Sequence, residues 1–227
     1  MARLRWLGHA AWYLELDGKR LLIDPFISKN PAAPVKLEEL ERVDYVVVTH
    51  DHFDHVGDSF EICKRFDALF VGMYELKVKA EQNGVRRAFG ANIGGVFNAD
   101  GLKVTLTPAV HSADPAGVVL HGDEAVIYHA GDTGLFGDMK YIGQLYKPDI
   151  ALLPIGSLYT MGPREAAIAA SLIKPKIVIP MHYNTYEAIK QDPKQFEALV
   201  RARAKGVKVV VLNPGETFEY SRKKARK

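Results

Sequence analysis

Apolar and polar positions along the chain predict two groups of strands interleaved with helices. Three strands joined as a meander open the chain, and the Asp17-Gly18 turn between two of them is typical of a β-hairpin. Short β-branched runs then alternate with amphipathic stretches, which is the rhythm of strand–helix units. The expected strands cover residues 3–7, 11–17, 20–24, 43–48, 68–71, 102–107, 117–120, 125–129, 149–154, 176–180, 207–212 and 216–220. The expected helices cover residues 59–66, 75–83, 164–173 and 193–205, with one or two helical turns over 36–41.

The sequence shows no internal boundary between domains. No low-complexity segment or linker interrupts residues 1–220, and 227 residues of which 48% are hydrophobic are enough to bury the core of one domain. The end of the chain differs, because five of its last six residues are Lys or Arg. We therefore expect a single domain over residues 1–220 and a basic, disordered tail over residues 221–227.

The densest group of reactive side chains follows the apolar run 43–48. The segment 49–55, Thr-His-Asp-His-Phe-Asp-His, holds three histidines and two aspartates. Loops at the ends of buried strands are rigidly held and commonly carry sites. Imidazole nitrogens from His50, His52 and His55, with a carboxylate oxygen from Asp54, suit Zn, Mn or Fe. A polar turn with solvated histidines is the alternative, but four potential ligands in six positions argue against it.

Three later strands also end at a histidine or an aspartate. His111 follows residues 102–107, Asp132 lies between two glycines after residues 125–129, and His182 follows residues 176–180. The glycines let the backbone approach closely and leave Asp132 free to project. Taken alone, His111 would be an ordinary loop histidine and Asp132 a capping residue in a glycine turn. Together with the segment 49–55, they become candidate ligands.

The pattern His50-x-His52-x-Asp54-His55 after an apolar strand resembles the signature of the metallo-β-lactamase-fold hydrolases. The resemblance runs from His9 to about Tyr220 and includes the family's five metal-binding stretches in order. It implies an α/β protein with an αββα sandwich fold, in which two mixed β-sheets pack face to face with helices outside. The segment 7–10, Leu-Gly-His-Ala, and the compact size are similar to a subgroup of uncharacterised hydrolases that resemble L-ascorbate-6-phosphate lactonase.

The resemblance also implies a role for each candidate residue. The implied metal ligands are His50, His52 and His111 for one ion, Asp54, His55 and His182 for the other, and Asp132 as the bridge between them. Asp24 matches an acidic residue that supports the ligands from behind, and it also suits a strand-end cap before Pro25. His9 either faces the metal pocket, as the subgroup implies, or forms a hydrogen-bonded surface turn. Tyr183 and Asn184 are candidates to polarise a substrate oxygen.

These residues predict a metal-dependent hydrolase with a hydroxide activated by a dinuclear metal centre. Two ions can lower the pKa of bound water to about 7 and hold both the attacked group and the leaving oxygen. The sequence contains no Gly-x-Ser-x-Gly motif, which fits a reaction without a serine nucleophile. Asp54 and Asp132 are the expected catalytic carboxylates. The expected cofactor is two divalent ions, with Zn as first choice and Mn, Fe or Ni as alternatives, and the substrate is a small molecule with an ester, lactone or phosphodiester bond.

Three other functions fit the same fold. A nuclease or phosphodiesterase acting on RNA is the first, but only 49 residues separate Asp132 from His182, which leaves no room for an RNA-binding insertion. A di-iron redox protein is the second, and His52 stands where such proteins typically have Glu. A metal-binding protein without catalysis is the third, and the complete set of seven ligand matches argues against it.

Composition bounds the partners and the location. The net charge is +3, but without the last six residues 25 Lys and Arg face 27 Asp and Glu, so the body is slightly acidic. Nucleic acid is therefore not an expected partner beyond weak contacts of the tail. The single cysteine, Cys63, excludes an internal disulfide and suits a packing role. With no apolar run of membrane-spanning length and no signal peptide, we expect a cytoplasmic protein without membrane contact; a homo-oligomer stays open.

Overall fold

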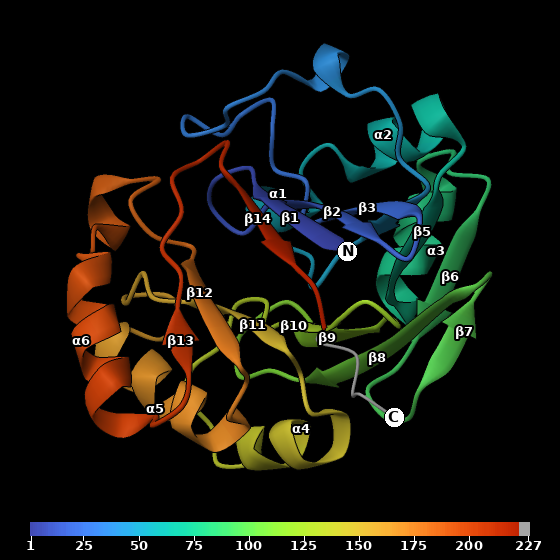
Figure 1. Ribbon diagram of the computed structural model, residues 1–227. Helices are drawn as coiled ribbons and strands as arrows, with labels where there is room; N and C mark the ends of the chain where they lie inside the picture. The colour runs from blue at the N-terminus through green and yellow to red at the C-terminus, as the bar shows by residue number, and fades with distance from the viewer. Residues whose placement is uncertain (223–227) are drawn as a thin grey trace.

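The computed structural model describes residues 1–222, and the strands of this part form two mixed sheets of seven strands each. The first sheet has the order β14-β1-β2-β3-β4-β5-β6, and the second has the order β13-β12-β11-β10-β9-β8-β7. The sheets face each other, α2 and α3 cover the outer face of the first, and α4, α5 and α6 cover that of the second (Figure 1). The predicted αββα sandwich is confirmed. Most of the expected tail lies outside the described residues.

The structure assigns each element the following bounds. The strands are β1 (Ala2–Trp6), β2 (Trp12–Leu16), β3 (Lys19–Ile23), β4 (Tyr45–Val47), β5 (Leu69–Met73), β6 (Ala88–Ala91), β7 (Phe97–Ala99), β8 (Leu102–Pro108), β9 (Ala116–His121), β10 (Val126–His129), β11 (Ile150–Pro154), β12 (Ile177–Met181), β13 (Lys208–Val209) and β14 (Thr217–Tyr220). The helices are α1 (Phe53–Val56), α2 (Ser59–Phe66), α3 (Tyr74–Gln82), α4 (Met139–Tyr146), α5 (Pro163–Ile173) and α6 (Pro193–Arg203), with 3₁₀ turns η1 (Leu37–Glu39) and η2 (Glu187–Ile189).

The N-terminal meander follows the alternation of its residues. Trp12 and Leu14 of β2 are fully buried between the sheets, whereas Glu15 of the same strand is half-buried on the other face. The turn between β2 and β3 has positive φ at both Asp17 and Gly18, 51° and 74°, which matches the right-handed twist of the paired strands. The hairpin predicted from this dipeptide is therefore present.

Parallel strands bring the polar segments to one edge of the sandwich. The strands β3, β4, β5 and β6 are parallel neighbours in the first sheet, and β10, β11, β12 and β13 are parallel neighbours in the second. All residues of β4, β10 and β12 are buried, as expected for strands covered on both faces. The segments that follow these three strands carry the candidate ligands, and ligands commonly bind beyond the carboxyl ends of parallel strands.

Two helices in the second half of the chain begin at residues that favour a helix start. Pro163 is the first residue of α5 after Gly162, and Pro193 opens α6 after Asp192. Proline suits this position because its missing N–H would have no partner within the helix. The Asp192 side chain accepts a hydrogen bond from the Lys194 backbone amide and so caps α6. The predicted helices over 164–173 and 193–205 are thus present, the second ending at Arg203.

Several elements differ from the predictions. The helices α1 and α4 and the strands β6 and β7 were not expected, and the strand over 207–212 is reduced to the pair Lys208–Val209. Each of the four is short, and β6, with the sequence Ala-Phe-Gly-Ala, has weak strand propensity. Its pairing with β5 decides its conformation. A segment such as β6 forms because of tertiary contacts that no local pattern encodes, whereas α4 is amphipathic, with Met139 and Ile142 buried, and the prediction missed it.

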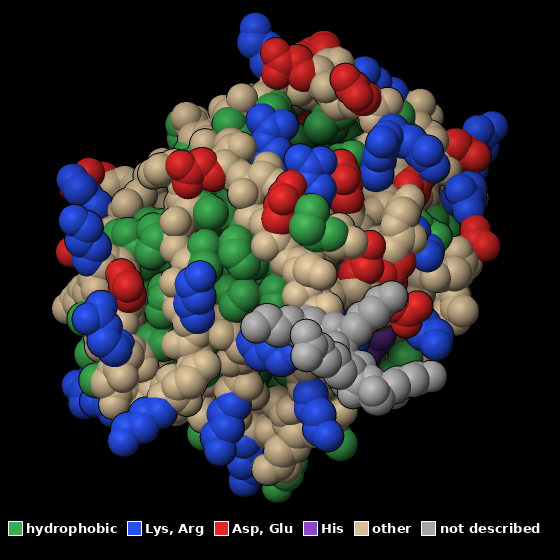
Figure 2. Space-filling model, viewed as in Figure 1, with side chains coloured by type: hydrophobic (Ala, Val, Ile, Leu, Met, Phe, Trp, Pro, Cys, Tyr) green, Lys and Arg blue, Asp and Glu red, His purple; other side chains and the backbone are tan. Residues whose placement is uncertain are grey.

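The surface mixes charges of both signs. Acidic and basic side chains are interspersed on the face shown in Figure 2, and a hydrophobic patch lies between α6 and β14. Val211, which is 39% exposed, belongs to the segment between these two elements. None of the helices within residues 1–222 is long and apolar enough to cross a membrane.

Candidate metal centre

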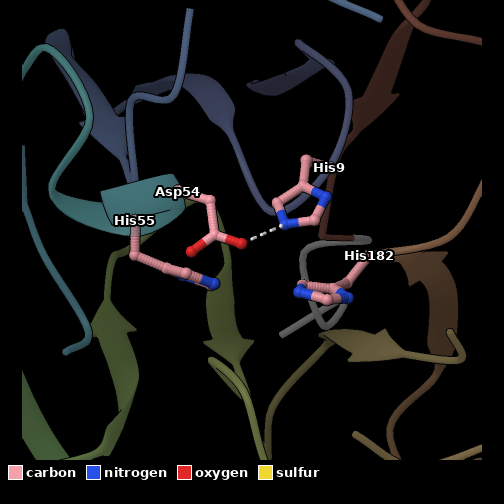
Figure 3. A group of neighbouring side chains, drawn as sticks. All are labelled: His9, Asp54, His55 and His182. Carbon is pink, nitrogen blue, oxygen red and sulfur yellow. Dashed lines mark hydrogen bonds and ion pairs between the residues drawn. The ribbon is translucent and has the colours of Figure 1, made fainter. Parts of the chain in front are cut away.

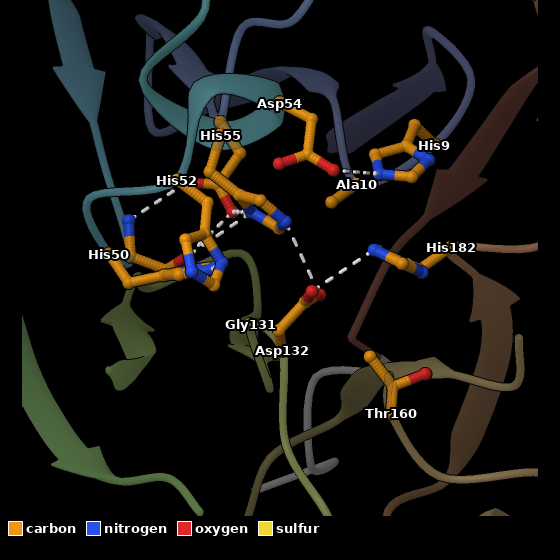
Figure 4. A network of polar contacts seen from close by, with 12 residues as sticks. His9, Ala10, His50, His52, Asp54, His55, Gly131, Asp132, Thr160 and His182 are labelled. Carbon is orange, nitrogen blue, oxygen red and sulfur yellow. Dashed lines mark hydrogen bonds and ion pairs between the residues drawn. The ribbon is translucent and has the colours of Figure 1, made fainter. Parts of the chain in front are cut away.

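The candidate ligands from both sheets converge at one edge of the sandwich. Their donor atoms form three overlapping groups in which all atoms lie within 4.8 Å of one another. The groups are His50, His52 and His111; His9, Asp54, His55 and His182; and His50, His55 and Asp132. All seven residues predicted as ligands are brought together, and His9 joins them. Figure 4 labels His9 and all of the seven except His111. The segments and the family resemblance predicted these residues as ligands, and the structure places their donor atoms close enough together to share metal ions.

The first group joins the loop after β4 to the loop after β8. His50 Nε2 lies 2.9 Å from His52 Nδ1, and His111 Nε2 lies 3.3 Å from the same His52 atom. His50 is buried, while His52 and His111 are partly exposed toward the cavity described below. Three imidazoles with converging nitrogens are the donor set that Zn²⁺ and related ions accept.

The second group is built on the short helix α1 (Figure 3). The expectation from the sequence was a loop, but residues 53–56 form one helical turn, which places Asp54 and His55 side by side. His182, after β12, faces them from the other sheet, and its ring centroid lies 5.8 Å from that of His55. His9 lies against His182 with 3.9 Å between the ring centroids. Three imidazoles and one carboxylate thus surround one point.

Asp132 lies between the two groups. Its Oδ1 is 3.3 Å from His55 Nε2, and its Oδ2 is 3.0 Å from His182 Nε2 and 3.7 Å from His111 Nε2. It reaches this position from the loop after β10, where Gly131 has a φ of 61°. A Cβ at Gly131 would lie 2.8 Å from the Ala116 carbonyl oxygen, so only glycine fits there.

The buried donor atoms fit a metal ion. Among residues 1–222, His55 Nε2, Asp132 Oδ1 and both ring nitrogens of His182 are buried and accept or donate no hydrogen bond. A buried polar atom without a partner costs about 1–3 kcal/mol, and such atoms are rare in proteins. Three of them, His55 Nε2, Asp132 Oδ1 and His182 Nε2, meet around the Asp132 carboxylate. Nitrogen and carboxylate donors mixed in this way are the chemistry of a divalent cation site.

Asp24 supports the ligands from behind. Its carboxylate is fully buried, accepts hydrogen bonds from the Thr49 amide at 2.8 Å and the Thr49 hydroxyl at 2.7 Å, and lies 2.7 Å from His55 Nδ1. The Nδ1–H of His55 therefore donates to Asp24, which leaves Nε2 free to point at the cluster. Such a carboxylate–histidine pair fixes the ring orientation and the tautomer of a metal ligand.

His9 is buried, not part of a surface turn. Its Nε2 lies 3.1 Å from Asp54 Oδ2, and its Nδ1 lies 2.9 Å from the Thr185 hydroxyl. Its backbone carbonyl accepts hydrogen bonds from the Trp6 indole and from the His182 amide. Of the two positions that the sequence left open, the structure shows the one facing the pocket.

His129 holds the loop that carries Asp132. Its buried ring donates from Nε2 to the Ala10 carbonyl at 2.9 Å, and its Nδ1 accepts from the Gly131 amide at 3.1 Å. The ring therefore links the turn that contains His9 to the turn that contains Asp132. His129 thus packs in the core and also supports the loop of the candidate site.

The site keeps most of its histidines neutral and its carboxylates charged. Burial lowers the pKa of His50 to about 3 and that of His9 to about 4, so both imidazoles are neutral near pH 7. Burial alone would also lower the pKa of His55, but the neighbouring carboxylates of Asp132 and Asp24 raise it well above its ordinary value. Burial would raise the pKa of Asp132, yet His55 and His182 hold it well below its usual range. A cation bound among these groups would balance the negative charge of the carboxylates, as the proton on His55 does.

A cavity of about 480 Å³, called here the central cavity, opens over the cluster. Its floor is formed by donors of both groups and by Asp132. Its walls include Phe53, Tyr159, Tyr186 and Ile189, which come from α1, from the loop between β11 and α5, and from the segment around η2. A cavity of this volume suits a small molecule.

Tyr183 and Asn184 do not line the central cavity. The ring of Tyr183 stacks on Trp6 at 5.4 Å between centroids, and burial raises the pKa of its hydroxyl to about 12. The Asn184 side chain accepts a hydrogen bond from the Gln191 amide. Their adjacency to His182 suggested contact with a substrate, but the backbone there turns away, with φ of 54° at His182 and 59° at Asn184. Tyr186 was missed because aromatic residues in loops carry no distinguishing pattern.

Comparison with known proteins agrees with the fold and with metal dependence. A family model described as "Beta-lactamase superfamily domain" matches residues 19–183. A UPF0173 metal-dependent hydrolase from Caldivirga maquilingensis is 54% identical over 223 residues, which are 96% of this chain and 98% of that protein. Another from Methanopyrus kandleri is 50% identical over 229 residues, which are 96% of this chain and 99% of that protein.

A solved structure extends the comparison to three dimensions. Igni18, described as a novel metallo hydrolase from the hyperthermophilic archaeon Ignicoccus hospitalis, is 44% identical and has a TM-score of 0.90. The match covers 97% of this chain and 99% of that one. Near-complete coverage in both directions means that the two chains share the fold along their whole length, without a large insertion. The chain belongs to the β-lactamase superfamily and is one of its metal-dependent hydrolases.

Proposed function

We propose that this hydrolase acts through two divalent ions held side by side at the candidate metal centre. One ion would bind His50, His52 and His111, the other would bind Asp54, His55 and His182, and Asp132 would bridge them. The observation that carries the proposal is the position of Asp132, whose two oxygens face histidines from both groups at 3.0–3.7 Å. A carboxylate has one oxygen for each of two cations.

Each part of the chain has a distinct task in this proposal. Bound ions would act as Lewis acids and lower the pKa of a water molecule so that it attacks near neutral pH. Asp24 keeps His55 in the tautomer that presents Nε2. His9 holds one oxygen of Asp54 through Nε2 and leaves the other oxygen toward the cluster. His129 fixes the backbone before Asp132. These contacts preorganise the donors before any ion or substrate arrives.

The substrate we propose is a small molecule with an ester, lactone or phosphodiester bond. The volume of the central cavity, about 480 Å³, supports this size class. Zinc is our first choice of metal, because imidazole-rich sites with a few carboxylates bind it well, and Mn, Fe or Ni are alternatives that availability decides.

The first test is metal content. Protein purified without a histidine tag and analysed for metals should hold about two ions per chain, and it should hydrolyse at least one class of chromogenic ester, lactone or phosphodiester. Asp132→Asn should lower both occupancy and activity, whereas Asp123→Asn, on an exposed hairpin turn far from the centre, should change neither. Full activity with one ion per chain would refute the two-ion proposal, and failure to take up any metal on reconstitution would refute the site itself.

A further inference from the structure

The walls of the central cavity differ in character from its floor. The floor is polar and belongs to the metal centre, but the walls carry the rings of Phe53, Tyr159 and Tyr186 and the side chains of Ala188 and Ile189. Three separate segments supply these groups: α1, the loop between β11 and α5, and the segment around η2. A substrate held at the floor would therefore extend between apolar surfaces.

The aromatic rings at the rim are unusually exposed for their size. Phe53 is 70% exposed, Tyr159 is 61% exposed and Tyr186 is 40% exposed. Phe53 is held in place by an edge-to-face contact with Phe26, with 5.8 Å between the ring centroids. Tyr186 makes a similar contact with His9 at 6.0 Å. Exposed apolar groups clustered around a concave site mark a ligand-binding surface, since covering them is favourable.

The walls offer nothing to balance a negative charge. Within residues 1–222, no Lys or Arg side chain lines the central cavity. Two lysines close to the lining residues are already paired: Lys190 contacts Glu187 in η2, and Lys79 contacts Asp51, which adjoins His52 in the sequence. An anionic group projecting away from the metals would lose water without gaining an ionic partner, which is unfavourable.

We propose that the group projecting from the scissile bond of the substrate is apolar and uncharged, such as an alkyl or aryl chain. This inference rests on the proposed function, because it takes the metal centre as the place where the bond is cleaved. It narrows the substrates to compounds whose reacting bond lies on the floor while an uncharged hydrophobic chain lies between Phe53, Tyr159 and Tyr186. Sugar phosphates and nucleotides, whose remote groups are charged or strongly polar, do not fit these walls.

The test is a matched pair of p-nitrophenyl esters on the metal-loaded protein. The valerate ends in a methyl group, and the monoester of glutarate carries a carboxylate at the same position. We expect kcat/KM for the valerate to exceed that for the glutarate at least about tenfold. In the series acetate, butyrate and hexanoate, kcat/KM should rise roughly fourfold per methylene until the walls are covered.

Variants test which residues contact the acyl chain. Phe53→Ala and Tyr186→Ala should flatten the chain-length series and leave the metal content unchanged. Tyr141→Ala removes an aromatic ring of similar exposure, 48%, from α4 outside the cavity and should leave the series unchanged. Preference for the glutarate, or a series that Phe53→Ala does not alter, would overturn the inference while the metal-dependent cleavage stands. Absence of cleavage of every ester and phosphodiester by protein holding two ions would overturn the proposed function and this inference with it.

Discussion

Replacing His9 tests whether binding of the second ion depends on a residue that positions one of its proposed ligands, Asp54. The ring of His9 holds Asp54 Oδ2 at 3.1 Å and is itself held by the Thr185 hydroxyl at 2.9 Å. Burial lowers its pKa to about 4, so near pH 7 the ring carries one proton. That proton lies on Nε2, because Nδ1 accepts from Thr185 and the carboxylate of Asp54 requires a donor. His9→Ala leaves this carboxylate oxygen without its donor.

The expected loss can be stated in advance. A hydrogen bond to a charged group is worth about 1.5–3 kcal/mol, and removal of a residue that orients a metal ligand weakens metal affinity about 10–100-fold, which is about 1.4–2.7 kcal/mol. The two ranges agree. We therefore expect His9→Ala to weaken binding of one ion by about 10–100-fold. Binding of the other, at His50, His52 and His111, should stay within about threefold.

The assay is a titration of metal-free protein with Zn²⁺ against a chromogenic chelator, which separates the two binding steps. His9→Gln provides a rescue, because its side-chain amide can donate to Asp54 but cannot replace an imidazole ligand. His121→Ala is the matched control: His121 bonds the Thr105 hydroxyl at 2.9 Å and is no member of the cluster. Unchanged affinity of both ions in His9→Ala would refute the role, and a loss that Gln does not rescue would make His9 a direct ligand.

Three further predictions concern metal, charge and the cysteine. Removal of metal by a chelator should lower the midpoint of thermal unfolding, and an ion at 100 times its Kd should restore about 2.7 kcal/mol of stability, as calorimetry with and without Zn²⁺ would show. Asp149, held by Arg222 and Lys176, has a pKa below its usual value, so its stabilising effect is present near pH 7 and is lost as the pH falls through that lowered pKa. Urea unfolding should thus show Asp149→Asn to be less stable than the parent by about 2 kcal/mol at pH 7. This difference should shrink as the pH falls below the ordinary pKa of an aspartate, and a difference that does not change with pH would contradict this. Burial raises the pKa of the Cys63 thiol to about 12, so iodoacetamide at pH 8 should leave the folded chain unmodified by mass spectrometry and label it in urea.

The sequence, with the family resemblance that it carries, predicted the fold that the structure confirms, and it predicted candidate ligands whose donor atoms the structure brings close together. Buried strands such as β4 and β12 are continuous apolar runs, and each is followed at once by its histidines. The order of these strand-then-ligand segments matches one fold, and parallel strands carry their carboxyl ends to the same edge. A pattern of a few residues therefore predicted donors that the fold brings together from segments more than 100 residues apart.

The remaining features depend on tertiary contacts that a single sequence does not display. Tyr183 and Asn184 were predicted to face a substrate because they follow His182, but positive φ values at His182 and Asn184 redirect the chain. The walls of the central cavity come from segments without regular periodicity, so no pattern singled out Phe53 or Tyr186. Arg222 fell within the expected tail, yet its guanidinium contacts Asp149 at 2.7 Å. Loop direction and terminal docking are decided by what the chain packs against.

The division of the site between the sheets has a consequence for stability as well as for chemistry. The segment 49–55 belongs to the first sheet, whereas His111, Asp132 and His182 follow strands of the second. Each proposed ion would thus have ligands from both sheets and would act as a link across the sandwich. Within residues 1–222, buried nitrogen and oxygen atoms of the cluster lie close together without a hydrogen-bond partner. Metal binding should therefore tighten the edge where the sheets meet, and the same contacts that prepare the reaction should stabilise the fold.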